Sequence, residues 1–464
     1  MAGQGNVVPY TQRKKIETSN KLPEDVVEVI FSFLPYKKLC SLSILSKRYI
    51  NSWKLCRNLS FDIDFARNLS RGECRNIVNK FFNNHETTCA DRFQLRYDAS
   101  DESNLVSSWV GKAIRLGIKE LELDLTQKTR DTRLVYDLID VESLKIMKLV
   151  NCKLELPLSS KGLPHLQEIT LQNVIMDDMP PLVESIFLNC MSLRVFRLIK
   201  CNLGNTLRAY AQDLRGFETL VVKDCPDLHA TLVNSPSLQT FHYHGKITDL
   251  RFCCEMPYLD DVILHIAHPR FFKQFSNRNE LLDRLAFLEI LTVTTIFLEG
   301  LCARFENHAY RKMKFYLHRL KEFHLIVAPE SFVNPSDVAI FIKRCPTLQK
   351  LFIDLGRDAF GSSLYWKNYG MNHLSACEAT FPYMKYVKIK GFTMNELPMC
   401  MARFFLKNSI NLHSLILVKA RIHNFPIKYS SENIRWGIIS NATIEIRNYR
   451  GDKDTVMPKY LRGV

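Results

Sequence analysis

Two stretches of the chain share one spacing of apolar residues, and that spacing decides the fold. The first reads Leu144-Lys145-Ile146-Met147-Lys148-Leu149-Val150-Asn151-Cys152-Lys153-Leu154, and the second reads Leu193-Arg194-Val195-Phe196-Arg197-Leu198-Ile199-Lys200-Cys201-Asn202-Leu203. Both place apolar residues at positions 1, 4, 6 and 11 and a cysteine at position 9. Successive side chains of a strand point to opposite faces, so positions 3–7 predict a short strand with positions 4 and 6 buried.

Weaker copies of this pattern extend over most of the chain. They begin at Ile118, Leu166, Phe217, Leu238, Leu259, Leu288, Leu320, Leu348, Met384 and Leu412. The twelve starts lie 21 to 36 residues apart, mostly in or near the range of leucine-rich repeats. One repeat cannot bury its own apolar face, so stacking must supply the core. The predicted fold is therefore α/β, a curved leucine-rich-repeat solenoid with a parallel inner sheet over residues 61–380.

Proline marks the entry to five of the repeats. Pro164, Pro236, Pro257, Pro346 and Pro382 each stand two residues before a repeat start. Proline cannot continue a helix and biases its predecessor toward extended backbone. These residues predict the end of an outer segment and the start of the next strand.

The residues before the solenoid predict three short helices. Pro23 with Glu24 and Asp25 suits a first helical turn. An apolar stripe follows at helical spacing, and two further helical patterns cover residues 37–42 and 46–53. A core this small leaves large apolar groups uncovered, so the unit is expected to need a partner. Residues 1–20 have no apolar periodicity and predict a flexible tail.

The segment from residue 21 to 60 resembles an F-box. The family's pattern is matched by Leu22-Pro23, Val27, Ile30, Phe33-Leu34-Pro35, Leu45-Ser46-Lys47-Arg48 and Trp53. With the repeats and the stretch from Met384 onward, the chain resembles plant F-box proteins with leucine-rich repeats and an FBD-type C-terminal region. The resemblance implies an F-box at 21–60, an FBD-like cap at 381–450 and a tail at 451–464. It also implies a non-catalytic substrate-recognition adaptor of a Skp/cullin/F-box-type ubiquitin ligase. The F-box would dock on the Skp-type adaptor, and through it on the cullin, while the repeats would bind the target protein.

Two sets of candidate binding residues follow. The adaptor-binding set consists of large apolar residues of the F-box, because such anchors dominate interface energies: Leu22, Pro23, Val27, Ile30, Leu34, Pro35, Leu45 and Trp53. Some of them, especially Ile30 and Leu45, could instead fill the small helical core. The substrate-binding set stands at positions 3, 5 and 7 of the repeats, which line the concave face: Arg197, His242, His244, His265 and His324.

The charge of the chain is concentrated at its ends. The chain has 464 residues and a formal charge of +15. Residues 1–60 hold 10 basic and 4 acidic side chains, residues 381–464 hold 14 and 5, and the rest balance. The 36 concave positions include seven acidic and six basic residues, which disfavours nucleic acid as a partner because phosphate tracking needs clustered Lys and Arg. The basic N-terminal end favours an acidic protein partner instead.

Several other functions are excluded by missing signals. No apolar run is long enough to span a membrane, so no membrane partner is expected. Fourteen cysteines without a C-x-x-C pair, and no signal peptide, predict reduced thiols in the nucleus or cytoplasm and neither metal nor cofactor. The sequence contains no known catalytic motif, so we do not expect an enzyme. The rival interpretation is a leucine-rich-repeat scaffold or nucleic-acid-binding protein whose F-box-like segment merely caps the repeats.

Overall fold

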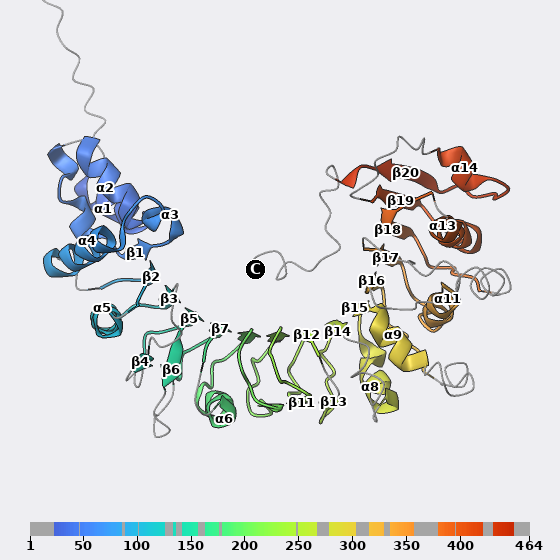
Figure 1. Cartoon of the computed structure of the whole chain (residues 1–464), viewed down its shortest axis with the longest axis horizontal. Coiled ribbons are helices and arrows are strands. Elements are labelled where there is room, and N and C mark those ends of the chain that lie inside the picture. The colour runs from blue at the N-terminus through green and yellow to red at the C-terminus, as the bar shows by residue number, and fades with distance from the viewer. Residues whose placement is uncertain are drawn as a thin grey trace, which may run out of the picture.

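The chain forms an arch with one continuous sheet on its inner side and most helices on its outer side (Figure 1). The computed structural model describes residues 23–45, 47–85, 89–100, 102–125, 133–135, 142–155, 163–175, 179–246, 249–266, 278–302, 315–328, 335–356, 379–394, 396–420 and 430–449. The two predicted tails, 1–20 and 451–464, lie outside these residues. None of the helices within the described ranges is long and apolar enough to cross a membrane.

The inner sheet is parallel throughout, and within the described ranges it has fifteen strands. In spatial order these are β1 (Asn58–Phe61), β2 (Arg92–Tyr97), β3 (Glu120–Leu125), β5 (Ile146–Val150), β7 (Glu168–Gln172), β8 (Val195–Ile199), β10 (Thr219–Lys223), β12 (Thr240–Gly245), β14 (Asp261–Ile266), β15 (Ile290–Thr294), β16 (Glu322–Ile326), β17 (Lys350–Asp354), β18 (Tyr386–Phe392), β19 (Ser414–Lys419) and β20 (Thr443–Arg447). The spatial order of the strands follows their order in the chain, as stacking repeats require. The predicted fold class is confirmed.

Each of the twelve predicted repeats contains a strand that begins two residues after the predicted start, as β5 does after Leu144. The structure adds β1, β2 and β20, which the sequence pattern missed. Their first positions are Cys56, Ala90 and Asn441, which are small or polar where the pattern expects a large apolar residue. The five predicted proline entries all lie in turns directly before a strand, which confirms their role.

The turn after several strands uses one backbone conformation. In the repeats that contain β5, β7, β8 and β10, position 8 has a φ of 51–56° and is occupied by Asn151, Asn173, Lys200 and Asp224. Asparagine and aspartate enter this left-handed region more easily than most residues. Asn173 Nδ2 donates to Asn151 Oδ1 at 2.7 Å, and Asn151 Nδ2 donates to Asp124 Oδ1 at 3.2 Å. These bonds tie adjacent turns together at one edge of the sheet.

Repeat length decides what covers the outer face. The longer repeats carry α4 (Arg71–Asn84), α5 (Ser103–Arg115), α6 (Met179–Asn189), α8 (Arg278–Arg284) with the turn η3 (Leu285–Phe287), α9 (Thr295–Cys302), α11 (Pro335–Lys343), α13 (Glu396–Asn408) and α14 (Ser431–Arg435). In the three short repeats between Leu193 and Leu259, the outer side is a small sheet of β9 (Thr206–Tyr210), β11 (Ala230–Asn234) and β13 (Asp249–Phe252). A strand rises more than twice as far per residue as a helix, so fewer residues cross the same distance. A second pair, β4 (Arg133–Val135) with β6 (Lys153–Glu155), lies near α5.

The N-terminal helical unit, residues 23–55, begins with α1 (Glu24–Ser32) and α2 (Tyr36–Leu45). The helix predicted over 46–53 is instead two short 3-10 turns, η1 (Lys47–Tyr49) and η2 (Ser52–Leu55), and Ser46 lies outside the described residues. Asn51 separates the turns at φ −105° and ψ 4°. Asparagine competes for backbone hydrogen bonds and so disfavours a helix interior.

The helical unit shares its core with the first repeat. The ring of Tyr36 lies 5.1 Å from that of Phe61 on β1, 5.0 Å from Phe81 on α4 and 6.2 Å from Phe65 on α3 (Ile63–Ala66). Trp53 on η2 completes this aromatic cluster at 6.3 Å from Tyr36. Aromatic pairs at these distances add about 0.5–1.5 kcal/mol each beyond burial. Packing is therefore continuous across residue 60.

Candidate functional site

The helical unit lies at one end of the arch (Figure 1), and several of its large apolar side chains are exposed. Large exposed apolar side chains among its described residues are Val26, Val29, Ile30, Phe33, Ile44 and Ile50, and we call this set the docking face. Phe33 is 77% and Ile44 85% exposed. The opposite side of α1 packs inward through Val27 and Phe31. Val26, Ile30 and Phe33 recur at helical spacing, so they lie on one side of α1. Exposed apolar groups on one side of a helix are typical of interaction sites in soluble proteins.

The structure places the predicted adaptor-binding residues in different environments. Pro23 and Ile30 are exposed, and Ile30 belongs to the docking face rather than to the core. Leu34, Pro35 and Trp53 are half-buried. Val27 is 7% exposed and packs into the core, so its side chain offers little contact surface. Leu22 lies outside the described residues, as does the side chain of Leu45.

The candidates chosen from the sequence did not include Val26, Val29, Phe33, Ile44 and Ile50, which the structure exposes. One signal could have found the members on α1. This helix reads Glu-Asp-Val-Val-Glu-Val-Ile-Phe-Ser, and five of its nine residues are large and apolar. A one-sided stripe covers only about a third of a helix surface. A surplus of this kind predicts a second apolar face on the same helix.

The concave face brings three of the five predicted substrate-binding residues together. His242 and His244 lie on β12, and His265 lies on the neighbouring β14. Arg197 lies on β8, two strands before β12, and His324 lies on β16, two strands after β14. Residues at positions 3 and 5 alternate with the buried positions 4 and 6 along most strands, as in β7 and β16. The histidines therefore form a central cluster with Arg197 and His324 on either side.

The central histidines are held by carboxylates and by one another. His244 Nδ1 donates to Asp224 Oδ1, and the rings of His244 and His265 are stacked with centroids 4.0 Å apart. His242 Nε2 lies 3.3 Å from Asp261 Oδ2. Burial and, to a smaller extent, the neighbouring His244 lower the pKa of His265 to about 4. Burial also lowers the pKa of His244, although Asp224 opposes this change. The two stacked rings are therefore neutral at physiological pH.

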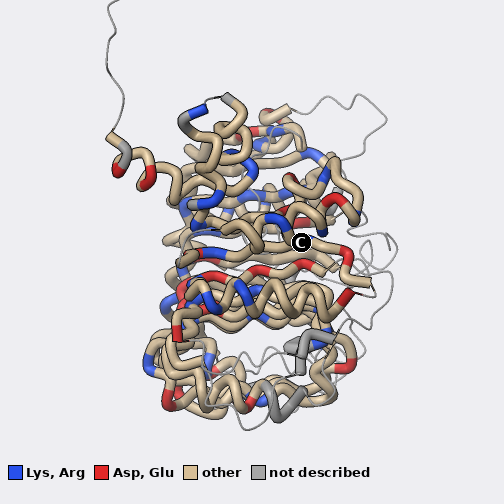
Figure 2. The backbone as a smooth tube through the Cα atoms, turned by 90° about the vertical axis from the view of Figure 1, so that its left-hand side faces the viewer, with Lys and Arg blue, Asp and Glu red and all other residues tan. Residues whose placement is uncertain are grey.

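Charged side chains on the concave face pair across neighbouring strands. Glu122 accepts from Lys148 at 2.7 Å and from Arg92 at 2.9 Å. Further pairs include Arg197 with Glu168 at 3.3 Å, Lys350 with Glu322 at 3.3 Å and Lys390 with Asp354 at 3.1 Å. Figure 2 shows both signs interspersed along the stacked repeats. Arg92 is not among the concave basic residues counted from the sequence, because the repeat pattern did not predict its strand, β2.

His324 occupies a separate site on the same face. Its Nε2 atom lies 2.5 Å from Glu322 Oε1, and its ring stacks on Phe352 with centroids 4.4 Å apart. The hydrogen bond from His324 lowers the pKa of Glu322, against the effect of burial. This part of the face therefore combines an aromatic surface with a fixed carboxylate.

The cysteines at position 9 point into the stack. Cys152, Cys201 and Cys225 are buried, and burial raises the pKa of their thiols to about 12, 11 and 12. Cys201 Sγ donates to Leu171 O at 3.3 Å. Protonated thiols of this kind are poor nucleophiles and poor metal ligands. Within the described part of the chain, no three His, Cys, Asp or Glu side chains are placed to hold a metal ion.

Known proteins match both the helical unit and the repeats. Residues 81–443 match the family described as the LRR domain of At1g61320/AtMIF1, and residues 20–61 match the F-box domain. The FBD-associated F-box protein At1g61320 of Arabidopsis thaliana is 29% identical over 419 residues, which cover 88% of this chain and 90% of that protein. The putative FBD-associated F-box protein At1g61330 of the same plant is 28% identical over 416 residues, covering 87% and 91%. The F-box/FBD/LRR-repeat protein At2g26030, also from Arabidopsis thaliana, is 22% identical over 413 residues, covering 86% and 91%.

Proposed function

We propose a substrate-recognition role in a Skp/cullin/F-box-type ubiquitin ligase for this chain, which belongs to the plant family that joins an F-box to the At1g61320/AtMIF1 leucine-rich-repeat domain. F-box domains generally bind Skp-type adaptors, and the names of the relatives describe F-box proteins. In this role the chain performs no covalent chemistry itself. It holds a target protein near the ubiquitin-conjugating enzyme, and proximity alone accelerates a transfer reaction strongly.

The observation that carries this proposal is the docking face. Its side chains lie on α1, on α2 and in the turn after η1, at the end of the arch that the repeats do not cover. Water-exposed Phe33, Ile44 and Ile50 lose an unfavourable hydration shell when a partner covers them. Large apolar anchors of this kind account for most of the binding energy in protein interfaces.

Target binding is assigned to the concave face. The charges there are paired between strands, and the stacked rings of His244 and His265 are neutral. A face without a field of one sign cannot select a target by long-range attraction. We therefore expect recognition by shape and by short-range contacts around the central histidines, with Arg197 and His324 at the flanks.

Co-purification with a Skp-type adaptor tests the proposal. The double variant Ile30→Asp with Phe33→Asp places two carboxylates in the apolar contact and should weaken adaptor capture about a hundredfold, at ~1.4 kcal/mol for each tenfold step. Both residues are exposed, so the fold should persist, which circular dichroism checks. Leu188→Asp is the matched control, because Leu188 is 71% exposed but lies on α6 of the solenoid.

Two outcomes would contradict this function. If the wild-type chain captures no adaptor at micromolar concentrations, the scaffold interpretation replaces it. If the double variant is captured as well as the Leu188→Asp control, the docking face is not the contact surface.

A further inference from the structure

Large exposed apolar side chains line one edge of the inner sheet in the second half of the arch. The strands are parallel, so the segments that lead into them lie along the same edge. In six of the seven repeats from β14 to β20 this segment carries large apolar side chains that are exposed, and we call the set the rim patch: Tyr258, Phe287, Tyr316, Tyr383, Ile410, Trp436 and Ile439. These repeats form the limb of the arch that ends in β20 (Figure 1).

Hydrogen bonds hold neighbouring parts of this edge together. Asn411 Nδ2 donates to Pro382 O at 2.7 Å, which joins the turn before β19 to the turn before β18. The backbone N–H of Leu317 donates to Arg344 O at 2.9 Å and joins the segments before β16 and β17. Adjacent strands lie ~4.8 Å apart, so the seven repeats form a row roughly 30 Å long.

The exposed area of the rim patch is sufficient for a stable dimer. The exposed fractions range from 46% at Tyr316 to 102% at Ile439. With about 200 Å² for each large side chain, the rim patch presents roughly 1,000 Å² of surface. A stable interface buries about 800 Å² on each partner. The rim patch alone therefore supplies the surface that one copy needs to bury against another.

The rim patch is arranged so that it complements itself. A two-fold axis through the β17 repeat, along the radius of the arch, turns this edge onto itself in reverse order. It places β14 of one copy against β20 of the other, β15 against β19 and β16 against β18. At the axis, the described residues before β17 include the exposed Pro346 but no large exposed apolar side chain, so the two copies can approach closely there. A two-fold interface requires such self-complementarity.

The charges at the two ends of the edge are opposite in sign. Asp260 and Asp283 are exposed in the segments that lead into β14 and β15. Lys407 and Arg435 are exposed in the segments that lead into β19 and β20. Arg435 Nη1 donates to Ser440 O at 2.9 Å, which holds the guanidinium at this edge. The reverse alignment therefore brings acidic ends against basic ends, and such complementarity fixes the register of an interface.

Basic side chains near the axis are compensated within each copy. The reverse alignment brings Arg319 and Lys321, before β16, near Lys385, before β18. Glu289 pairs with Lys321 at 2.7 Å and with Arg319 at 3.6 Å. These ion pairs reduce the repulsion between like charges at this place.

We propose that two copies of this chain dimerise through the rim patch in the reverse alignment, so that Phe287 of one protomer packs against the partner's Ile410. The docking face lies at the opposite end of the arch and stays uncovered (Figure 1). The proposal does not rest on the ligase role, because it concerns the isolated chain. A segment of another protein is the competing occupant, and it predicts that the isolated chain is a monomer.

Sedimentation equilibrium of the full chain measures the dimer directly. Interfaces of this size reach micromolar or tighter dissociation constants, so the wild type should be a dimer at about 10 µM. Phe287→Lys and Ile410→Asp each place two charges against apolar surface and should raise the dissociation constant about a hundredfold. Both residues are exposed, so the circular dichroism of the variants should match the wild type. Leu188→Asp is the matched control, because Leu188 is equally accessible but lies on α6, and it should remain a dimer.

A mixture of the two variants tests the reverse alignment. In a mixed dimer, the introduced lysine faces the introduced aspartate at one contact, and the other contact keeps both native side chains. Mixed dimers should therefore form about tenfold more tightly than dimers of either variant alone. A mixture no more associated than its two components would overturn the proposed alignment and the proposal with it.

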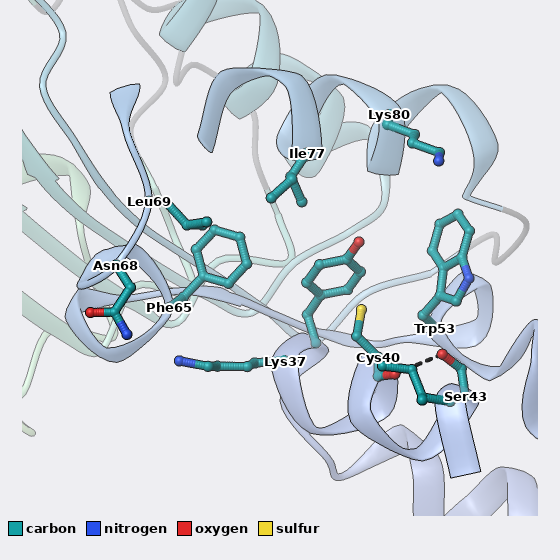
Figure 3. A pocket seen from close by; sticks show the side chains of 11 residues that line it. Lys37, Cys40, Ser43, Trp53, Phe65, Asn68, Leu69, Ile77 and Lys80 are labelled. Carbon is teal, nitrogen blue, oxygen red and sulfur yellow. Dashed lines mark hydrogen bonds between the residues drawn. The ribbon is translucent and has the colours of Figure 1, made fainter. Parts of the chain in front are cut away.

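Ile44→Asp distinguishes the rim patch from the docking face. Ile44 is 85% exposed and lines a pocket between α2 and α4 at the other end of the arch, together with Trp53 and Phe65 (Figure 3). This variant should remain a dimer. Three results would each overturn the proposal: a wild type that is monomeric at about 50 µM, dimers that survive both Phe287→Lys and Ile410→Asp, or dimers that are lost only in Ile44→Asp.

Discussion

His265 makes the solenoid less stable in mild acid, and the size of the effect follows from its surroundings. Its ring is stacked on His244, and Lys223 and Asp224 are the other charged groups near it. The pKa falls from 6.5 to about 4 on folding. Between these values the unfolded chain binds the proton and the folded chain does not, so the free energy of unfolding falls as pH falls. The contribution of neutral His265 to the free energy of unfolding is fully present above pH 6.5.

The predicted loss of stability in acid can be measured by comparing the wild type with variants of single histidines. Going from pH ~7.5 to pH ~5.5 should cost the wild type about 1.3 kcal/mol through His265 alone. We expect His265→Gln to lack this component, so its guanidinium unfolding curve should shift less with pH. His165→Gln, which removes a histidine from an exposed turn, is the matched control. If the unfolding midpoints of His265→Gln and His165→Gln respond identically to pH, the neutral, desolvated state assigned to His265 is wrong.

Two further predictions concern stability and use the same unfolding assay. Gly391 has a φ of +77°, and an added Cβ would lie 3.0 Å from the carbonyl oxygen of Gly356, so Gly391→Ala should cost about 1–3 kcal/mol. Gly111→Ala in α5 meets no atom within 4 Å and should instead stabilise by about 0.5–1 kcal/mol. Phe81→Ala removes a fully buried ring of the aromatic cluster and should cost about 3–5 kcal/mol. The exposed Phe33→Ala should stay within about 0.5 kcal/mol of the wild type, and a loss equal to that of Phe81→Ala would refute the assigned burial.

The strand positions were predictable because their signal is local. Positions 4 and 6 of each repeat must be apolar to fill the stack, and this requirement recurs with every strand. The three strands that the pattern missed begin two residues after Cys56, Ala90 and Asn441, which are small or polar, and two of these strands, β1 and β20, are the edge strands of the sheet. A periodic pattern therefore reports the regular interior of the array better than its ends.

The docking face was only partly predictable for a different reason. The spacing of apolar residues predicts the helix, but it does not show which of these residues a neighbouring element will cover. Val27 and Ile30 stand three residues apart in one motif, yet Val27 packs inward and Ile30 faces solvent. The outcome depends on which side of α1 packs against η2 and Tyr49, which is a contact between separate segments of the chain.

The sequence by itself determined the repeat architecture, the parallel sheet, the F-box segment and the buried cysteines, since each depends on the spacing of neighbouring residues along the chain. Only the tertiary structure decided which F-box side chains stay exposed, which concave charges neutralise one another and that His244 stacks on His265. The physical reason is that burial, pairing and pKa depend on distances between elements, and spacing along the chain does not contain those distances.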